Sequence, residues 1–212
     1  MEESSKRMSR VENENNNESI QKLFNEEIEE GENGIVVYPN LQSFRQIYTQ
    51  FVKGQLEKAD ELLMPRIILI ATFYETIDSI KHHLSAVGVQ NVQSLIGNGS
   101  LLIIDSFSSY YPDIDGMKKL VTTLSDRARK EGRDGVTAIV DMGFFFMFGG
   151  DGRATELINY EASLAPKTEG YNVKGFSCYH GGNYNTLKDS QKEELAQIGK
   201  KVLEITESST TS

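Results

Sequence analysis

The sequence lacks the residues and segments that typify secreted and membrane proteins. Its 212 residues include a single cysteine, Cys178, and no tryptophan, so an internal disulfide is excluded and a reducing compartment is expected. No apolar run reaches the roughly 20 residues that a membrane-spanning helix needs. The N-terminus is polar and acidic, unlike a signal peptide. These absences predict a soluble, cytoplasmic protein without a membrane partner.

Basic charge is scarce as well. The formal net charge is −9. Residues 1–33 hold ten Glu against two Lys and two Arg, a net of −6, so residues 34–212 carry only −3. A protein that binds nucleic acid needs a basic surface to neutralise phosphates. Direct binding to nucleic acid is therefore not expected.

The chain divides into a polar head, a long core and a short tail. Residues 1–18 are acidic and Asn-rich and are predicted to be disordered. Residues 19–32 predict a short helix, whose apolar face is formed by Ile20, Leu23, Phe24 and Ile28. Residues 33–205 predict one domain, and residues 206–212 a disordered tail.

Strands and helices are expected to alternate within the core. Apolar runs predict five strands, at 34–38, 66–72, 100–105, 135–142 and 173–180. Amphipathic segments predict helices at 41–60, 75–87, 114–131, 153–165 and 186–205. Most strand runs are continuously apolar, which is typical of parallel strands covered on both faces. The predicted fold class is therefore α/β: a three-layer sandwich with a mostly parallel sheet of five or more strands.

Candidate ligand-binding residues follow the predicted strands, because open parallel sheets bind ligands outside the carboxyl ends of their strands. They combine two carboxylates with aromatic, imidazole and sulfur groups: Tyr38, Asp105, Asp141, Cys178, Tyr179 and His180. Since the crossovers share one hand, all but Cys178 are expected to converge on one cleft. No catalytic residue, cofactor or metal is predicted.

The run "GFFFMFGGDG" at 143–152 adds Phe144 and Phe146 to the candidate site. One interpretation is a loop that covers the core before a helix capped by Asp151. The other is a mobile lid over an apolar pocket. The sequence supports both about equally.

Asp105 ends the apolar run "SLLIID", a position at which P-loop ATPases keep the carboxylate that holds Mg²⁺. That role requires a Gly-rich loop, then Lys and Ser or Thr, after the first strand. The residues there are "YPNLQSFRQIY", which have no glycine and no lysine, and Pro39 removes an amide donor. ATP hydrolysis is therefore not expected. Asp105 is expected either to bond the amides of the following turn or to contact a ligand or metal.

Cys178 and His180 are two residues apart on one predicted strand, so their side chains share a face and a thiolate–imidazole pair is geometrically allowed. No orienting acid or oxyanion loop accompanies them, and a lone strand cysteine is usually just buried. His82 and His83 are neighbours on a predicted helix and diverge by about 100°, so they cannot share one metal ion. A zinc site is not predicted.

Several segments together resemble the MEDS family, the methanogen/methylotroph sensory domains named for the regulator DcmR. They are the strand–helix–strand at 34–72, "LLIIDSFSSYYP", "ATELINYEASL" and "VKGFSCYH". The residues that carry the resemblance are Tyr38, the pair Tyr160–Glu161 and the triplet Cys178–Tyr179–His180, and the match spans about residues 33–205. That family is similar to the RecA/KaiC ATPase core but lacks a working phosphate loop.

The resemblance implies a non-catalytic sensory domain that detects a small organic molecule and signals to a kinase or a transcription regulator. These 212 residues include neither effector, so the output is expected to act through a partner protein in trans. Two alternatives stay open: a degenerate RecA/KaiC-like ATPase adaptor, and a small cytosolic hydrolase that uses Cys178 and His180. Homo-oligomerisation is compatible with each of them.

Overall fold

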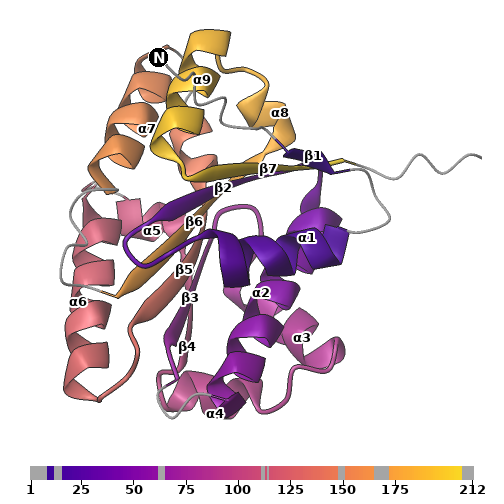
Figure 1. Cartoon of the computed structure of the whole chain (residues 1–212), viewed down its shortest axis with the longest axis vertical. Helices are drawn as coiled ribbons and strands as arrows, with labels where there is room; N and C mark the ends of the chain where they lie inside the picture. The colour runs from indigo at the N-terminus through magenta and orange to yellow at the C-terminus, as the bar shows by residue number, and fades with distance from the viewer. Residues whose placement is uncertain are drawn as a thin grey trace, which may run out of the picture.

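The protein folds as a three-layer α/β sandwich around one twisted sheet, as seen in the computed structural model (Figure 1). The structure describes residues 9–11, 16–61, 65–110, 113, 115–147, 151–164 and 172–206. Within them the sheet has seven strands in the order β1-β7-β2-β6-β5-β3-β4. All pairings in this sheet are parallel. The predicted fold class is thus confirmed.

The strands are β1 (Ser9–Val11), β2 (Asn33–Tyr38), β3 (Ile67–Thr72), β4 (Leu101–Asp105), β5 (Val136–Asp141), β6 (Val173–His180) and β7 (Lys201–Ile205). Strands β2 to β6 are the five that the sequence predicts. Every residue of β2 and β3 is buried, which explains why their sequences are continuously apolar rather than alternating.

Helices cover both faces of the sheet (Figure 1). One face carries α1 (Asn16–Lys22), the π-helical turn η1 (Leu23–Glu27), α2 (Leu41–Glu61), α3 (Ile77–Ala86) and α4 (Val92–Gly97). The other carries α5 (Ser106–Tyr110), α6 (Gly116–Lys130), the 3-10 turn η2 (Met142–Phe146), α7 (Asp151–Leu164), α8 (Gly181–Tyr184) and α9 (Asp189–Ile198). In the described part of the chain, no helix combines the length and apolar character needed to cross a membrane.

Each layer buries its own apolar core against the sheet. On the α2 face the predicted stripe is almost solvent-free, and Phe44, Phe51 and Val52 are 0% exposed. The face predicted for the segment 19–32 is buried in the same core. Its residues lie in α1, in η1, which continues α1 without a break, and at Ile28 just after them. The predicted short helix is therefore present and ends at Glu27.

Two strands contradict the sequence-based prediction. β7 lies in 186–205, predicted as one helix, and β1 lies in 1–18, predicted to be disordered. The predicted helix is interrupted at Gly199, whose backbone is extended. Any larger residue there would place its Cβ 2.8 Å from Ile35 Cδ1, so the close approach of the chain to β2 requires a glycine. Of the predicted tail 206–212, all but Thr206 lies outside the described residues.

Candidate functional site

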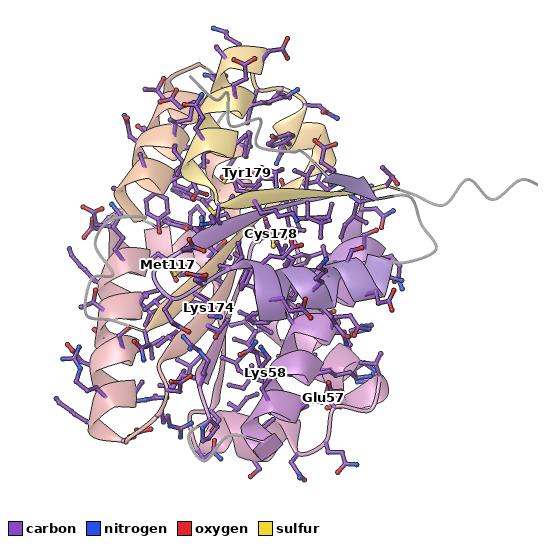
Figure 2. All side chains as sticks on the ribbon, in the orientation of Figure 1. Glu57, Lys58, Met117, Lys174, Cys178 and Tyr179 are labelled. Atoms are coloured by element: carbon purple, nitrogen blue, oxygen red, sulfur yellow. The ribbon has the colours of Figure 1, made fainter. Side chains whose placement is uncertain are left out.

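The predicted site residues of β6 divide over the two faces of the sheet. Cys178 belongs to the core on the α2 side, whereas its neighbour Tyr179 belongs to the core on the α7 side (Figure 2). His180 pairs in register with Tyr38, so both face the α2 side with Cys178. The expected convergence of Tyr179 with Tyr38 and His180 on one cleft is therefore wrong.

Asp105 is also remote from the others, because β4 is an edge strand and β3, β5 and β6 separate it from β2. Its Oδ1 accepts a hydrogen bond from Phe107 N at 3.0 Å, and its Oδ2 accepts one from Ser108 Oγ at 2.8 Å. These bonds cap the first turn of α5. Two roles were expected for Asp105, and the structure shows the first of them: its side chain bonds to the residues of the following turn.

Asp141 connects two strand ends from a fully buried position. Its Oδ2 accepts a hydrogen bond from the Tyr38 hydroxyl at 3.2 Å, and its Oδ1 accepts one from Gly143 N at 3.0 Å. The amides of Phe73 and Tyr74 also donate to it. Burial raises the pKa of Asp141 to about 6, although these donors partly offset the effect. This carboxyl group therefore holds together the ends of β2, β3 and β5.

His180 lies between two tyrosine rings at the carboxyl edge. Its ring centroid is 5.5 Å from that of Tyr38 and 5.7 Å from that of Tyr74. Its Nδ1 accepts a hydrogen bond from Gly182 N at 3.2 Å, which caps α8. Tyr74 is 43% exposed, and its hydroxyl accepts a hydrogen bond from Asn183 Nδ2. The imidazole thus helps to position the chain that follows β6.

Cys178 has the environment of a structural thiol. Its side chain is fully buried, and burial raises its pKa well above the usual value, with the carboxyl groups of Asp141 and Glu161 adding to the effect. No hydrogen bond joins it to His180 in the described part of the chain; its Sγ lies 4.0 Å from Phe176 O. A nucleophilic cysteine needs the opposite, a lowered pKa and access to substrate.

The start of α2 offers no phosphate cradle. Asn40 precedes the helix, and its Oδ1 accepts hydrogen bonds from Ser43 N at 2.9 Å and from Ser43 Oγ at 3.2 Å. The chain's own side chain therefore occupies the position at which an anion would meet the helix N-terminus. The arrangement agrees with the absence of a glycine-rich motif after the first core strand.

The aromatic run after β5 covers the core. Phe144 and Phe145 are 3% and 1% exposed. Phe144 stacks on Tyr110 of α5 at a centroid distance of 5.3 Å, and Phe145 meets the same ring edge-on at 5.2 Å. Phe146 is half-buried and Met147 is exposed. For residues 142–147 the core-covering interpretation is correct. Residues 148–150, the rest of the predicted lid, lie outside the described residues.

A groove of about 440 Å³ opens at the carboxyl ends of β2, β6 and β7. The segments after β2 and β6 form much of its wall, and its lining includes Tyr38, Pro39, Gly181, Gly182, Tyr184 and Glu204. The connection that follows β2 runs through α2 on one face of the sheet, whereas the one that follows β6 runs through α8 and α9 on the other. Because β2 and β6 are adjacent, the groove lies at a topological switch point.

Glu204 gives the groove its chemical character. It is the one charged side chain among the lining residues. It is half-buried, and its register partner in the neighbouring strand β1 is Arg10. Nearby, the hydroxyl of Tyr184 is buried without a hydrogen-bond partner in the same part of the chain, and burial, together with the charge of Glu204, raises its pKa. The groove therefore suits a small polar molecule with a cationic or hydrogen-bond-donating group.

Two glycines keep the groove open. A Cβ added to Gly181 would lie 3.4 Å from Tyr38 O, an ordinary contact, so the backbone does not require glycine there. The missing side chain instead leaves space between the ends of β2 and β6. Sequence analysis missed this part of the site. The pair "GG" directly after the last predicted strand was a usable signal, whereas Glu204 lay hidden in a segment predicted to be helical.

Comparison with known proteins adds no family assignment: no protein-family model matches the chain, and no curated protein matches it. Among the described residues there is also no group of three or more His, Cys, Asp or Glu side chains placed to hold a metal ion. The geometry of the site is therefore the basis for its proposed function.

Proposed function

We propose that this protein is a non-catalytic sensory domain that binds a small organic molecule in the groove and signals through a partner protein. The observation that supports it most is the groove itself. Its volume of about 440 Å³ falls in the range of roughly 300–1,000 Å³ typical of small-molecule sites. Its place at a switch point is where open α/β sheets bind their ligands.

The charge of the lining favours a cationic ligand. Glu204 gives the lining its one negative charge, and the groove's partial burial would strengthen an ion pair there relative to one on an open surface. Tyr38 and Tyr184 also line the groove, and the two residues are 1% and 2% exposed. An organic amine matches this combination better than a carboxylate or a phosphate does.

Two observations argue against the alternative functions. The capped N-terminus of α2 argues against a nucleotide-binding adaptor, because the Asn40 side chain already accepts the hydrogen bond of the Ser43 amide and thus stands where a phosphate would bind. The raised pKa of Cys178 argues against a cysteine hydrolase, because the thiol stays protonated and buried.

Signalling would begin at α8, which follows directly from the glycine pair. The helix contacts both β2 and β6, and Asn183 links it to the exposed ring of Tyr74. A ligand that orders Gly181 and Gly182 would therefore change the surface around Tyr74. A partner in trans, a kinase or a transcription regulator, would read that change.

The test compares ligand binding in two charge-neutralising variants. Native mass spectrometry of the protein purified from its own source should reveal a bound small molecule. Ethanolamine and benzylamine should raise the melting temperature of the wild-type protein, whereas acetate and benzoate should not. Glu204→Gln should weaken amine binding at least about tenfold. Glu194→Gln, the same change on an exposed part of α9, should have no effect.

The proposal fails if the purified protein carries no small molecule and no amine stabilises it. It also fails if the two variants bind amines equally well, since the groove would then not be the site.

A further inference from the structure

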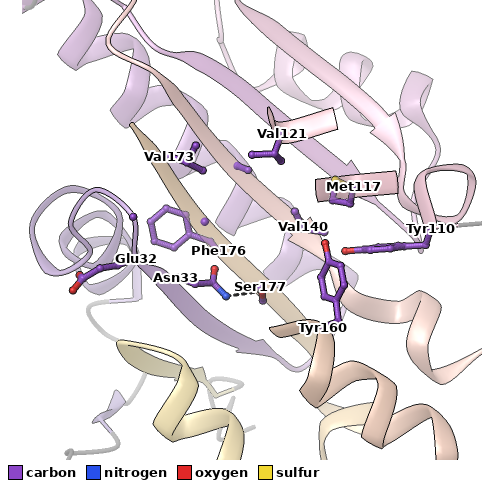
Figure 3. A pocket seen from close by; sticks show the side chains of 13 residues that line it. Glu32, Asn33, Tyr110, Met117, Val121, Val140, Tyr160, Val173, Phe176 and Ser177 are labelled. Atoms are coloured by element: carbon purple, nitrogen blue, oxygen red, sulfur yellow. Dashed lines mark hydrogen bonds between the residues drawn. The ribbon is translucent and has the colours of Figure 1, made fainter. Parts of the chain in front are cut away.

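A second hollow lies inside the protein, between the sheet and the helices α5, α6 and α7 (Figure 3). This cavity has a volume of about 70 Å³. Much of its wall is apolar, with Met117 and Val121 of α6 facing Ala138 and Val140 of β5. It belongs to the opposite face of the sheet from Cys178 and shares no lining residue with the groove.

On one side of the cavity, the side-chain amide oxygen of Asn33 can accept a further hydrogen bond. Asn33 Nδ2 donates to Glu161 Oε2 at 2.8 Å and to Ser177 Oγ at 3.0 Å. These two bonds fix the orientation of the amide, so that Asn33 Oδ1 lies over Gly175, only 2.7 Å from where a Cβ at that position would be. Both Asn33 and Gly175 line the cavity. No hydrogen bond to Asn33 Oδ1 comes from the described residues.

The other side carries a buried hydroxyl group. Tyr160 is 4% exposed, and its hydroxyl has no hydrogen-bond partner among the described residues. It points toward the Tyr110 hydroxyl (Figure 3). Tyr110 instead donates to Met142 Sδ at 3.7 Å. A buried hydroxyl left without a partner is unfavourable, and a ligand that bonds it would remove that cost.

We propose that this cavity is a second binding site, which takes a small neutral molecule with a short aliphatic body and a primary-amide-like polar group. The ligand's carbonyl oxygen would accept a hydrogen bond from the Tyr160 hydroxyl, and its N–H would donate to Asn33 Oδ1. The volume limits it to a few heavy atoms, since an apolar cavity of roughly 150 Å³ admits benzene.

Charge excludes an ionic ligand. Glu32 is the one ionisable carboxylate or amine that lines the cavity, and it is already engaged: Lys200 Nζ lies 2.7 Å from its Oε1, and Glu29 N donates to its Oε2 at 2.8 Å. An ion placed in the interior would have no counter-charge, which is costly in a buried site.

The experiment uses two probes that separate shape from hydrogen bonding. In heteronuclear NMR spectra, acetamide should shift the amide signals of Asn33, Ala138 and Tyr160, and xenon should shift an overlapping set. Ala138→Val fills the cavity and should abolish binding of both probes. Ala196→Val, the same change on α9 away from the cavity, should leave both unchanged.

Tyr160→Phe should weaken acetamide binding about tenfold and leave xenon binding as it is. Equal weakening of both probes would overturn the hydrogen-bonding role of Tyr160. Binding that persists in Ala138→Val, or a lack of shifts around the cavity, would overturn the site itself. Glu204→Gln should not alter acetamide binding, so this result is independent of the function proposed for the groove.

Discussion

The carboxyl edge of the sheet has an open half and a closed half. At the ends of β2, β6 and β7 the chain leaves a groove, and Gly181 and Gly182 contribute no side chain to fill it. At the ends of β5, β3 and β4 the following residues close over the sheet, with Phe144 and Phe145 packed into the core. All these strands run parallel, so the difference arises from the residues directly after each strand.

The acidic residues at this edge differ in the same way. Asp105 and Asp141, in the closed half, have their oxygens occupied by hydrogen bonds from nearby backbone and hydroxyl groups. Glu204, in the open half, has no such bond within the described part of the chain. The carboxylates that end β4 and β5 are thus structural groups, whereas the one inside β7 lines the groove.

The largest effect that would test this division is the loss of Asp141. Asp141→Ala leaves the Gly143 amide and the Tyr38 hydroxyl without their buried acceptor, and each such orphaned group costs about 1–3 kcal/mol. The free energy of unfolding, measured by urea denaturation, should fall by about 3–5 kcal/mol. A loss below about 1 kcal/mol would show that Asp141 does not hold the closed half together.

The pH dependence of stability should carry the next largest effect. The pKa of Asp141 is raised to about 6 in the folded protein, from 3.8, so the folded state binds the proton more tightly than the unfolded state does. This contribution to stability is complete below pH 4 and is lost as the pH rises through 6. Its size is on the order of 3 kcal/mol, at about 1.4 kcal/mol per pKa unit.

The matched control for this pH profile is Asp141→Asn. Burial also raises the pKa of Glu161, which adds a contribution of the same sign. The slope between pH 4 and 6 should therefore shrink in Asp141→Asn without vanishing. A profile identical to that of the wild-type protein would contradict the assignment to Asp141.

A smaller effect is expected at Asp105. Asp105→Ala removes the cap of α5, a short helix at the edge of the sheet, and caps of this kind contribute about 1 kcal/mol. Thermal unfolding should show this modest loss, while amine binding should stay unchanged. Weakened amine binding would mean that Asp105 contributes to the groove after all.

The smallest expected effect is that of nucleotide. Because Asn40 caps α2 and no glycine-rich loop precedes it, 1 mM ATP with Mg²⁺ should change the melting temperature by less than about 1 °C. A rise of several degrees would instead favour the ATPase-adaptor function and would place a ligand at the start of α2 rather than in the groove.

Much of the fold was predictable because buried parallel strands and long amphipathic helices leave strong patterns. The segment that became β7 was not, since its Lys and Glu residues continue the composition of the preceding helix. The position of Asp105 was also beyond reach. Strand order depends on tertiary packing, and nothing local shows that β4 lies at an edge.

The site was only partly predictable for related reasons. The separation of Tyr179 from Cys178 and His180 follows from the two-residue period of a strand and could have been deduced from sequence. The groove could not, because Glu204 approaches Gly181 only through the pairing of β7 with β2.

Hydrogen exchange with and without a bound amine compares the two halves of the edge in one measurement. We expect added protection at residues 181–185 and 201–206, in the open half, and unchanged exchange at residues 142–147 in the closed half. Glu204→Gln should remove that protection at the same amine concentration. Protection confined to residues 142–147, or unchanged exchange throughout the open half, would contradict the assignment of the groove as the ligand site.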